Sequence, residues 1–118
     1  MLVRLSIVAL LSVSTLQAQA PRPRKIFISV DMEGISGVVQ PAQLGPEGFE
    51  YQRAREWMTG EVNAAIAGIR AAGPAEIVVC DSHGNGQSVL IDRLPDDVRI
   101  VRGFVTRLLQ VLTSLELP

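Results

Sequence analysis

The sequence predicts an α/β fold in which helices flank an open, mainly parallel β-sheet in three layers. Two short apolar segments, at 26–30 and 76–80, are rich in β-branched residues and bounded by turn residues, which is typical of buried strands. Between them, apolar residues recur every three or four positions, which indicates an amphipathic helix. A strand, a helix and a second strand at this spacing predict a right-handed parallel unit.

The composition of the 118-residue chain restricts its classes of function. Its formal net charge is -1 and 4% of its residues are aromatic, so we expect no nucleic-acid partner. It has one cysteine, Cys80, which excludes an intrachain disulfide and a cysteine-based metal cluster. Its one histidine, His83, limits a zinc site built from this chain alone to a single imidazole.

Residues 1–20 have the pattern of a secretory signal peptide. Arg4 precedes an apolar segment at 5–11, and small and polar residues follow up to the cleavage motif Ala18–Gln19–Ala20. Cleavage after Ala18 and an uncleaved anchor are the alternatives, but the apolar segment is too short to span a bilayer. We therefore expect an exported protein, periplasmic or secreted, without a stable membrane anchor, and residues 21–24 as an extended lead-in.

The first predicted strand ends at two carboxylates, Asp31 and Glu33. Because residues two apart on a strand point to the same side, we expect these side chains to lie close together. Neighbouring carboxylates repel each other unless a proton or a cation lies between them, so the pair predicts a metal site. A loop rich in Pro and Gly follows at 40–48, and we expect it at the surface near the carboxylates, over a substrate.

Residues 50–72 predict a helix with one apolar stripe. Gly73 and Pro74 predict its end. Thr59 and Gly60 leave open a break into two helices, in which Thr59 would cap the second. The stripe consists of Ala54, Met58, Val62, Ala65, Ile66 and Ile69.

The second predicted strand ends at Asp81, Ser82 and His83. Ligand sites of open parallel sheets form at the carboxyl ends of the strands, so the topology brings this cluster to the two carboxylates. A lone histidine is more often a satisfied surface or core residue, but its position at this edge favours metal ligation. Cys80 belongs to the apolar strand and is expected to be a core residue rather than a reactive thiol.

The rest of the chain predicts a short third strand at 98–101, ended by Gly103, and a helix beginning around Thr106. Three strands and two helices leave sheet edges and an apolar helix face uncovered. We therefore expect the chain to be the front part of a larger, apparently truncated domain.

Three segments together resemble the D-aminopeptidases, which are binuclear zinc peptidases that release D-amino acids from short peptides. The segments are SVDMEGISG at 29–37, YQRAREWMTGEVNAAIAG at 51–68 and VVCDSHG at 78–84. The first and third at this separation form a specific pair. The resemblance makes residues 25–118 the N-terminal part of an α/β metallopeptidase domain.

The resemblance also implies the ligands and the activity. Two zinc ions would be held by a bridging Asp31, with Glu33 and His83 as further ligands. We further expect Asp81 and Ser82 to lie next to these ligands and to orient His83 and its neighbours. In its complete form the protein would be a metallo-aminopeptidase that acts on short D-amino-acid-containing peptides and releases D-amino acids such as D-Ala. Homo-oligomers are common in the family, as ring-like assemblies that enclose the sites.

The chain also departs from the family pattern. Family members supply another His and a Glu as ligands, and a catalytic His, from the half that follows. After Gly103 this sequence reads FVTRLLQVLTSLELP, where the family continues into another strand. We therefore expect no catalytic residue in this chain, the family's catalytic His lying beyond Pro118, and no activity of the chain alone.

Two alternatives remain open. An apolar strand that ends in two acids separated by one residue resembles the haloacid-dehalogenase-type phosphatases, in which Asp31 would be the nucleophile with magnesium. Glu33 stands where that motif has Asp, and no matching downstream Lys is evident. The other alternative is a non-catalytic exported α/β module, or remnant, that binds a metal ion.

Overall fold

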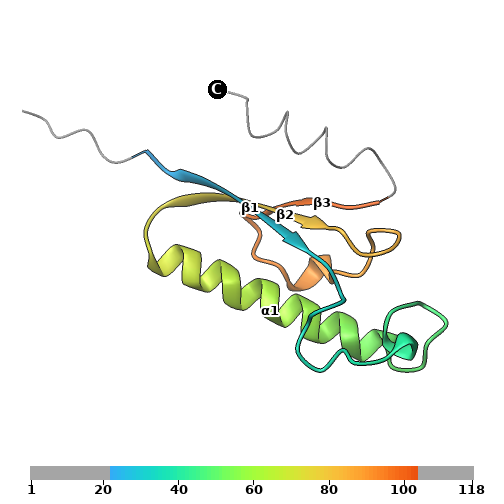
Figure 1. The fold of residues 1–118 in the computed structure, drawn as a ribbon. Helices are drawn as coiled ribbons and strands as arrows, with labels where there is room; N and C mark the ends of the chain where they lie inside the picture. Colours follow the sequence, from blue (N-terminus) through green and yellow to red (C-terminus); the bar gives the residue numbers. More distant parts are fainter. Residues whose placement is uncertain (1–21, 104–118) are drawn as a thin grey trace, which may run out of the picture.

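The computed structural model describes residues 22–103, which form a parallel sheet with a long helix packed on it (Figure 1). The predicted α/β class with an open parallel sheet is confirmed. In chain order the elements are β1 (Arg24–Val30), the 3-10 helix η1 (Pro41–Gln43), α1 (Tyr51–Ala71), β2 (Ala75–Asp81), the 3-10 helix η2 (Ile91–Arg93) and β3 (Arg99–Val101).

The sheet has the strand order β1-β2-β3, and both pairs of neighbours are parallel. Its register pairs Val30, the last residue of β1, with Asp81, the last residue of β2. The chain therefore leaves both strands at the same edge of the sheet. Arg24 already pairs with Ala75, so the predicted lead-in ends before it and β1 begins two residues earlier than expected.

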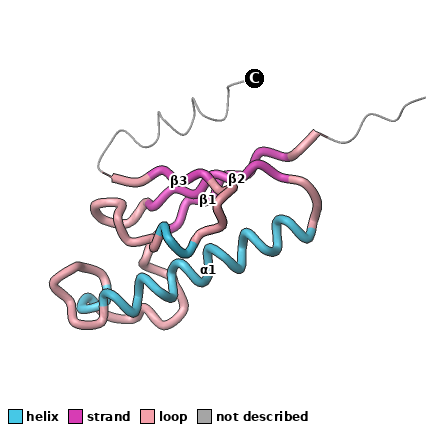
Figure 2. The backbone as a smooth tube through the Cα atoms, turned by 180° about the vertical axis from the view of Figure 1, so that it is seen from behind, coloured by secondary structure: helices cyan, strands magenta, loops and turns pink. Residues whose placement is uncertain are grey.

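Helix α1 covers one face of the sheet (Figure 2). The core between them is apolar, and each large side chain that it buries stabilises the fold by about 1.5–3 kcal/mol. Ala65, which we placed in the buried stripe, is exposed instead, and Thr59 is buried in the face that packs on the core. The core includes Met58, Val62 and Ile66 from α1, Ile77 and Val79 from β2, and Met32 from the turn after β1.

Helix α1 is continuous, so the break that the sequence left open at Thr59 and Gly60 does not occur. The Thr59 hydroxyl donates to the Arg55 carbonyl at 2.8 Å and accepts the Leu90 N–H at 3.0 Å. Its hydroxyl is thus satisfied within the helix and against the following loop, and no second N-terminus needs it as a cap. The helix ends before Gly73, as predicted, where φ of 124° suits glycine.

Several predictions fall on parts of the chain outside the described residues. They are the signal peptide at 1–20 and the helix beginning around Thr106, and they stay predictions. The third layer of the expected architecture is not among residues 22–103. Within those residues, no helix is both long enough and apolar enough to cross a membrane.

Candidate metal centre

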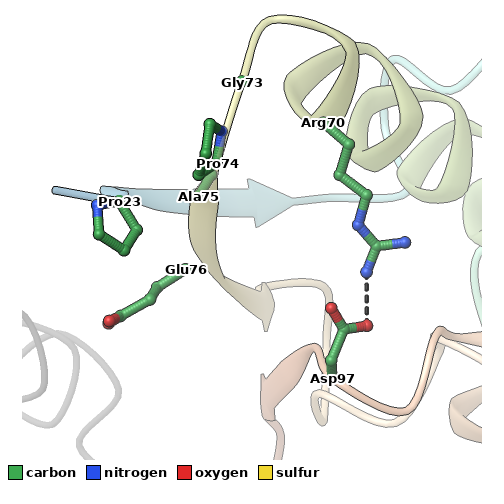
Figure 3. Close-up of a pocket in the computed structure, with 7 residues that line it drawn as sticks. All are labelled: Pro23, Arg70, Gly73, Pro74, Ala75, Glu76 and Asp97. Atoms are coloured by element: carbon green, nitrogen blue, oxygen red, sulfur yellow. Dashed lines mark hydrogen bonds and ion pairs between the residues drawn. The ribbon is translucent and has the colours of Figure 1, made fainter. Parts of the chain in front are cut away.

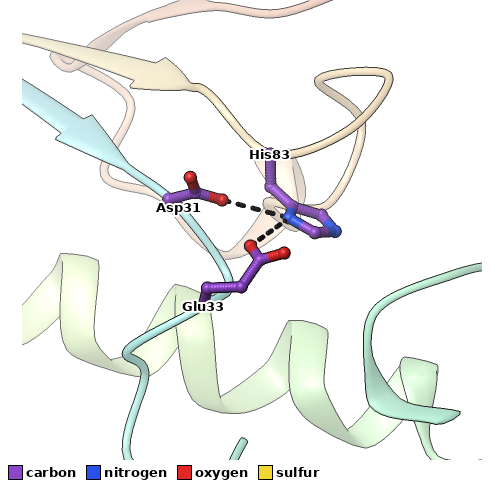
Figure 4. Close-up of side chains that lie close together, drawn as sticks. All are labelled: Asp31, Glu33 and His83. Atoms are coloured by element: carbon purple, nitrogen blue, oxygen red, sulfur yellow. Dashed lines mark hydrogen bonds and ion pairs between the residues drawn. The ribbon is translucent and has the colours of Figure 1, made fainter. Parts of the chain in front are cut away.

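Three side chains meet at the edge where β1 and β2 end (Figure 4). Asp31 directly follows β1, Glu33 lies in the next turn, and His83 lies two residues after the end of β2. One ligand atom from each of the three lies within 4.8 Å of the others. The parallel register alone thus gathers residues that are about 50 positions apart in the sequence.

The imidazole of His83 contacts both carboxylates. Its Nδ1 lies 3.0 Å from Asp31 Oδ1 and 2.8 Å from Glu33 Oε2. Its Nε2 lies 2.7 Å from the carbonyl oxygen of Leu44. Both ring nitrogens therefore face oxygen acceptors, and a cation, either a proton or a metal ion, is favoured between Nδ1 and the carboxylates.

The pKa of His83 reflects this environment. Burial of the ring lowers the pKa, but hydrogen bonds to the Leu44 carbonyl and to Asp31 and Glu33 outweigh it. The pKa is consequently raised from its ordinary value of 6.5. The negative charge around Nδ1 stabilises the protonated ring in the same way that it would stabilise a bound metal ion.

The three candidate ligands differ in exposure. The His83 side chain is 10% exposed, whereas those of Asp31 and Glu33 are 57% and 58% exposed. The imidazole is therefore enclosed by protein, while the carboxylates remain open to solvent. This arrangement lets an ion, a water molecule or a substrate reach the carboxylates directly.

The turn after β1 explains why Asp31 and Glu33 point the same way. We expected both on the strand, but the strand ends at Val30 and both lie beyond it. Met32, between them, is fully buried in the core and Ile35 is buried after them. Burial of Met32 on one side leaves its two neighbours on the other, so the alternation of a strand persists into the turn.

Asp81 binds the backbone of the segment that follows β2 and carries His83. The side chain is fully buried, and its Oδ1 accepts the His83 N–H at 3.4 Å while Oδ2 accepts the Val89 N–H at 2.7 Å. A buried carboxylate with two backbone donors holds both ends of a loop together. Asp81 thereby positions the main chain that carries His83.

Ser82 contacts the sheet. Its hydroxyl lies 2.8 Å from that of Ser29 and 3.6 Å from Cys80 Sγ, and its N–H donates to the Val30 carbonyl at 2.8 Å. These contacts extend the pairing of β1 with β2 by one residue. The ring of His83 is oriented instead by the Leu44 carbonyl, which the sequence analysis missed because a backbone carbonyl leaves no residue-type signal.

Helix α1 also holds the His83 loop, which the sequence analysis did not predict. Arg55 donates from Nε to the Ser88 carbonyl at 2.9 Å and from Nη2 to the Gln87 carbonyl at 3.2 Å. The hydroxyl of Tyr51 lies 3.1 Å from that of Ser88, which is fully buried. Residues 82–90, here called the His83 loop, are thus fastened between the sheet and the helix.

A cavity of about 570 Å³ lies away from these three side chains, at the opposite end of the sheet, where β1 and β2 begin (Figure 3). Among the residues that line it, Arg70 and Asp97 form an ion pair with each other. Its lining contains no imidazole or thiol, and its position is opposite to the carboxyl ends of the strands. The residues that line it are Pro23, Arg70, Gly73, Pro74, Ala75, Glu76 and Asp97. We therefore assign the candidate metal centre to Asp31, Glu33 and His83.

The chain is also similar to known proteins. A family model described as D-aminopeptidase matches residues 24–116. The D-aminopeptidase of Bacillus subtilis (strain 168) is 35% identical over 81 residues, which cover 69% of this chain and 30% of that protein. A solved structure, that of the Zn-dependent D-aminopeptidase DppA from Bacillus subtilis, is described as a self-compartmentalizing protease. It is similar at a TM-score of 0.66 and 34% identity, over 69% of this chain and 30% of that one. The chain thus spans about 30% of the length of these relatives.

Proposed function

The chain belongs to the D-aminopeptidase family, and we propose that the complete protein is a zinc-dependent aminopeptidase that releases D-amino acids, such as D-Ala, from short peptides. The observation that carries this proposal is the convergence of Asp31, Glu33 and His83 within 4.8 Å. The similar structure of DppA is named as zinc-dependent. Because this chain spans 30% of that protein, the activity is proposed for the complete protein and a partial metal centre for the chain.

The donor set fits zinc. Zinc prefers imidazole nitrogen and carboxylate oxygen ligands and takes about four of them. The Leu44 carbonyl accepts a hydrogen bond from the Nε2–H group, which leaves the lone pair of His83 Nδ1 for a metal ion. Asp31 offers two oxygens, which suits a bridging role between two ions.

When bound, the zinc pair would polarise the scissile carbonyl of the peptide and lower the pKa of a water molecule. The residues of this chain hold the donors in place: the Leu44 carbonyl selects the tautomer of His83, and Asp81 fixes its backbone. The remaining ligands and the catalytic histidine would come from the part of the family's length that this chain does not span.

Two further proposals concern the alternatives and the assembly. The family membership favours the peptidase over a phosphatase with Asp31 as nucleophile. Because DppA is described as self-compartmentalizing, we propose that the complete protein also forms a homo-oligomer.

Zinc binding by single variants tests the metal centre. Asp31→Asn and Glu33→Gln each remove a negative charge, and His83→Ala removes the imidazole. Each should raise the Kd for zinc by at least about tenfold, measured by competition with a chelating dye. Asp96→Asn is the matched control, because it neutralises an exposed acid in the turn before β3. Wild-type affinity in both Asp31→Asn and His83→Ala would contradict the assignment.

Hydrolysis by the complete protein tests the activity. We expect it to release D-Ala from D-Ala-Gly-Gly, to lose activity when a chelator removes the metal and to regain it with zinc. Asp31→Ala should abolish turnover. Activity that survives both the chelator and this substitution would rule out the zinc mechanism.

A further inference from the structure

An open cavity of about 270 Å³ adjoins the metal centre, because Glu33 forms part of its wall. Its wall consists of Glu33 with Gly34 and of residues from the following loop, namely Val38, Val39, Gln40, Pro41 and Leu44, of which Gln40 is polar but uncharged. Apart from the Glu33 carboxylate, no charged side chain lines it. Its chemistry therefore suits an uncharged, apolar group.

Gln43 keeps this cavity preformed. Gln43 is 3% exposed, and its Oε1 accepts hydrogen bonds from the backbone N–H groups of Val39 and Gln40 at 2.6 and 3.0 Å. Its Nε2 donates to the Gly37 carbonyl at 2.9 Å. One buried amide thus fixes the loop from residue 37 to residue 43, so the wall does not need to be ordered by a ligand.

Two residues connect the cavity to the metal centre. Glu33 contacts His83 Nδ1 and also forms part of the cavity wall. The carbonyl of Leu44 accepts from His83 Nε2, while the same residue lines the cavity. The cavity and the metal centre are therefore direct neighbours that share Glu33 and Leu44.

On the basis of the proposed function, we infer that this cavity binds the side chain of the substrate's N-terminal residue and selects uncharged aliphatic side chains. In an aminopeptidase the carbonyl of that residue lies at the metal ions, and its side chain branches from the adjacent carbon. The side chain can thus enter a cavity that shares a wall with the metal centre. An acidic side chain is disfavoured, because it would lose solvation among apolar groups beside the negative charge of Glu33.

Binding of two hydroxamates to the zinc-loaded complete protein tests this subsite separately from catalysis. D-Leucine hydroxamate and D-aspartic acid α-hydroxamate carry side chains of similar shape, but that of leucine is apolar and that of aspartate is negatively charged. We expect the leucine compound to bind at least about tenfold more tightly by isothermal titration calorimetry, the factor that a difference of 1.4 kcal/mol gives.

Val39→Lys should reduce this preference to less than about threefold, because an ammonium group in the cavity wall favours the aspartate side chain. Val39 is 85% exposed, so the fold should tolerate the change. Phe49→Lys is the matched control: Phe49 is 86% exposed, lies outside the cavity lining and undergoes the same change of charge. This control should keep the wild-type preference and activity.

The outcomes separate the subsite from the proposed function. Equal binding of the two hydroxamates, no binding of either, or the same preference in Val39→Lys as in the wild type would overturn the subsite. If peptides are hydrolysed by the zinc enzyme without this preference, the proposed function stands and the subsite fails. If the preference and its reduction in Val39→Lys are observed without any hydrolysis of D-peptides, the subsite stands and the proposed function fails.

Discussion

At the scale of the residue, the two nitrogens of the His83 ring have different partners, which fix how the ring is oriented at this site. Its Nδ1 faces Asp31 and Glu33, and its Nε2 faces the Leu44 carbonyl. A metal ion held by Nδ1 would take the place of a proton, while Nε2 would keep its hydrogen bond to Leu44. Proton and zinc would therefore compete for one position, and we expect zinc binding to depend on pH.

We predict that, after a chelator has removed zinc, His83 titrates above 6.5 in the folded protein. Because the folded pKa is raised, the ring's contribution to the free energy of unfolding is full below the unfolded pKa and disappears as pH rises through the folded pKa. Zinc affinity should change in the opposite direction and fall as pH drops below the folded pKa.

Proton NMR can follow this titration without ambiguity, because the chain has one histidine. Glu33→Gln should lower the folded pKa, since it removes one of the negative charges at Nδ1. Added zinc should abolish the titration near neutral pH. A folded pKa at or below that of the urea-unfolded chain would contradict the contacts of His83.

At the scale of the element, the position of His83 depends on the attachment of the His83 loop to α1. Arg55 supplies two of the hydrogen bonds and Tyr51 faces Ser88, while Asp81 holds the loop from the sheet side. The helix therefore contributes to the metal centre without providing a ligand. Its role is to present the loop in one conformation.

We predict that Arg55→Met lowers the free energy of unfolding by about 1–3 kcal/mol, because two loop carbonyls lose a charged donor. It should also weaken zinc binding by about tenfold, since the loop that carries His83 loosens. Urea unfolding and chelator competition measure the two effects.

Arg53→Met is the matched control on the same helix. Arg53 lies over the Trp57 ring at 5.2 Å, on the exposed surface, so its loss should cost at most about 1 kcal/mol and leave zinc affinity unchanged. Equal effects of the two substitutions on zinc affinity would show that Arg55 has no part in positioning the loop.

At the scale of the whole molecule, residues 22–103 provide one edge of a parallel sheet and three donor groups at it. Two zinc ions with about four ligands each need more donors than three side chains offer, even when one of them bridges. The two-zinc centre that we propose would therefore depend on residues from outside the described range of 22 to 103.

We predict that the 118-residue chain binds at most one zinc ion and that the complete protein binds two. Native mass spectrometry of both proteins measures the stoichiometry directly. His83→Ala should remove the ion from the 118-residue chain. Two tightly bound ions on that chain would contradict the division of ligands.

Sequence reasoning reached much of this fold because its signals are local. The β-branched segments, the spacing of Met58, Val62 and Ile66, and the stop at Gly73 follow from backbone geometry and burial within one element. The convergence of Asp31, Glu33 and His83 also followed, because parallel strands bring their carboxyl ends to one edge whatever the details of packing.

The tertiary structure decided the contacts that side chains make with backbone groups of distant segments. The Leu44 carbonyl that orients His83, and the Arg55 contacts that hold its loop, join groups 39 and 32–33 positions apart. Any residue type can supply a carbonyl, and an arginine on a helix is usually solvated, so neither carries a signal in the sequence. The fold class and the metal-ligand candidates were thus determined by the sequence itself. The orientation of the ring was decided by the tertiary structure, because hydrogen bonds from a side chain to the backbone carbonyl of a distant residue exist only once the chain has folded. The shape of the adjoining cavity depends on how the loop at 37–43 folds around the buried amide of Gln43.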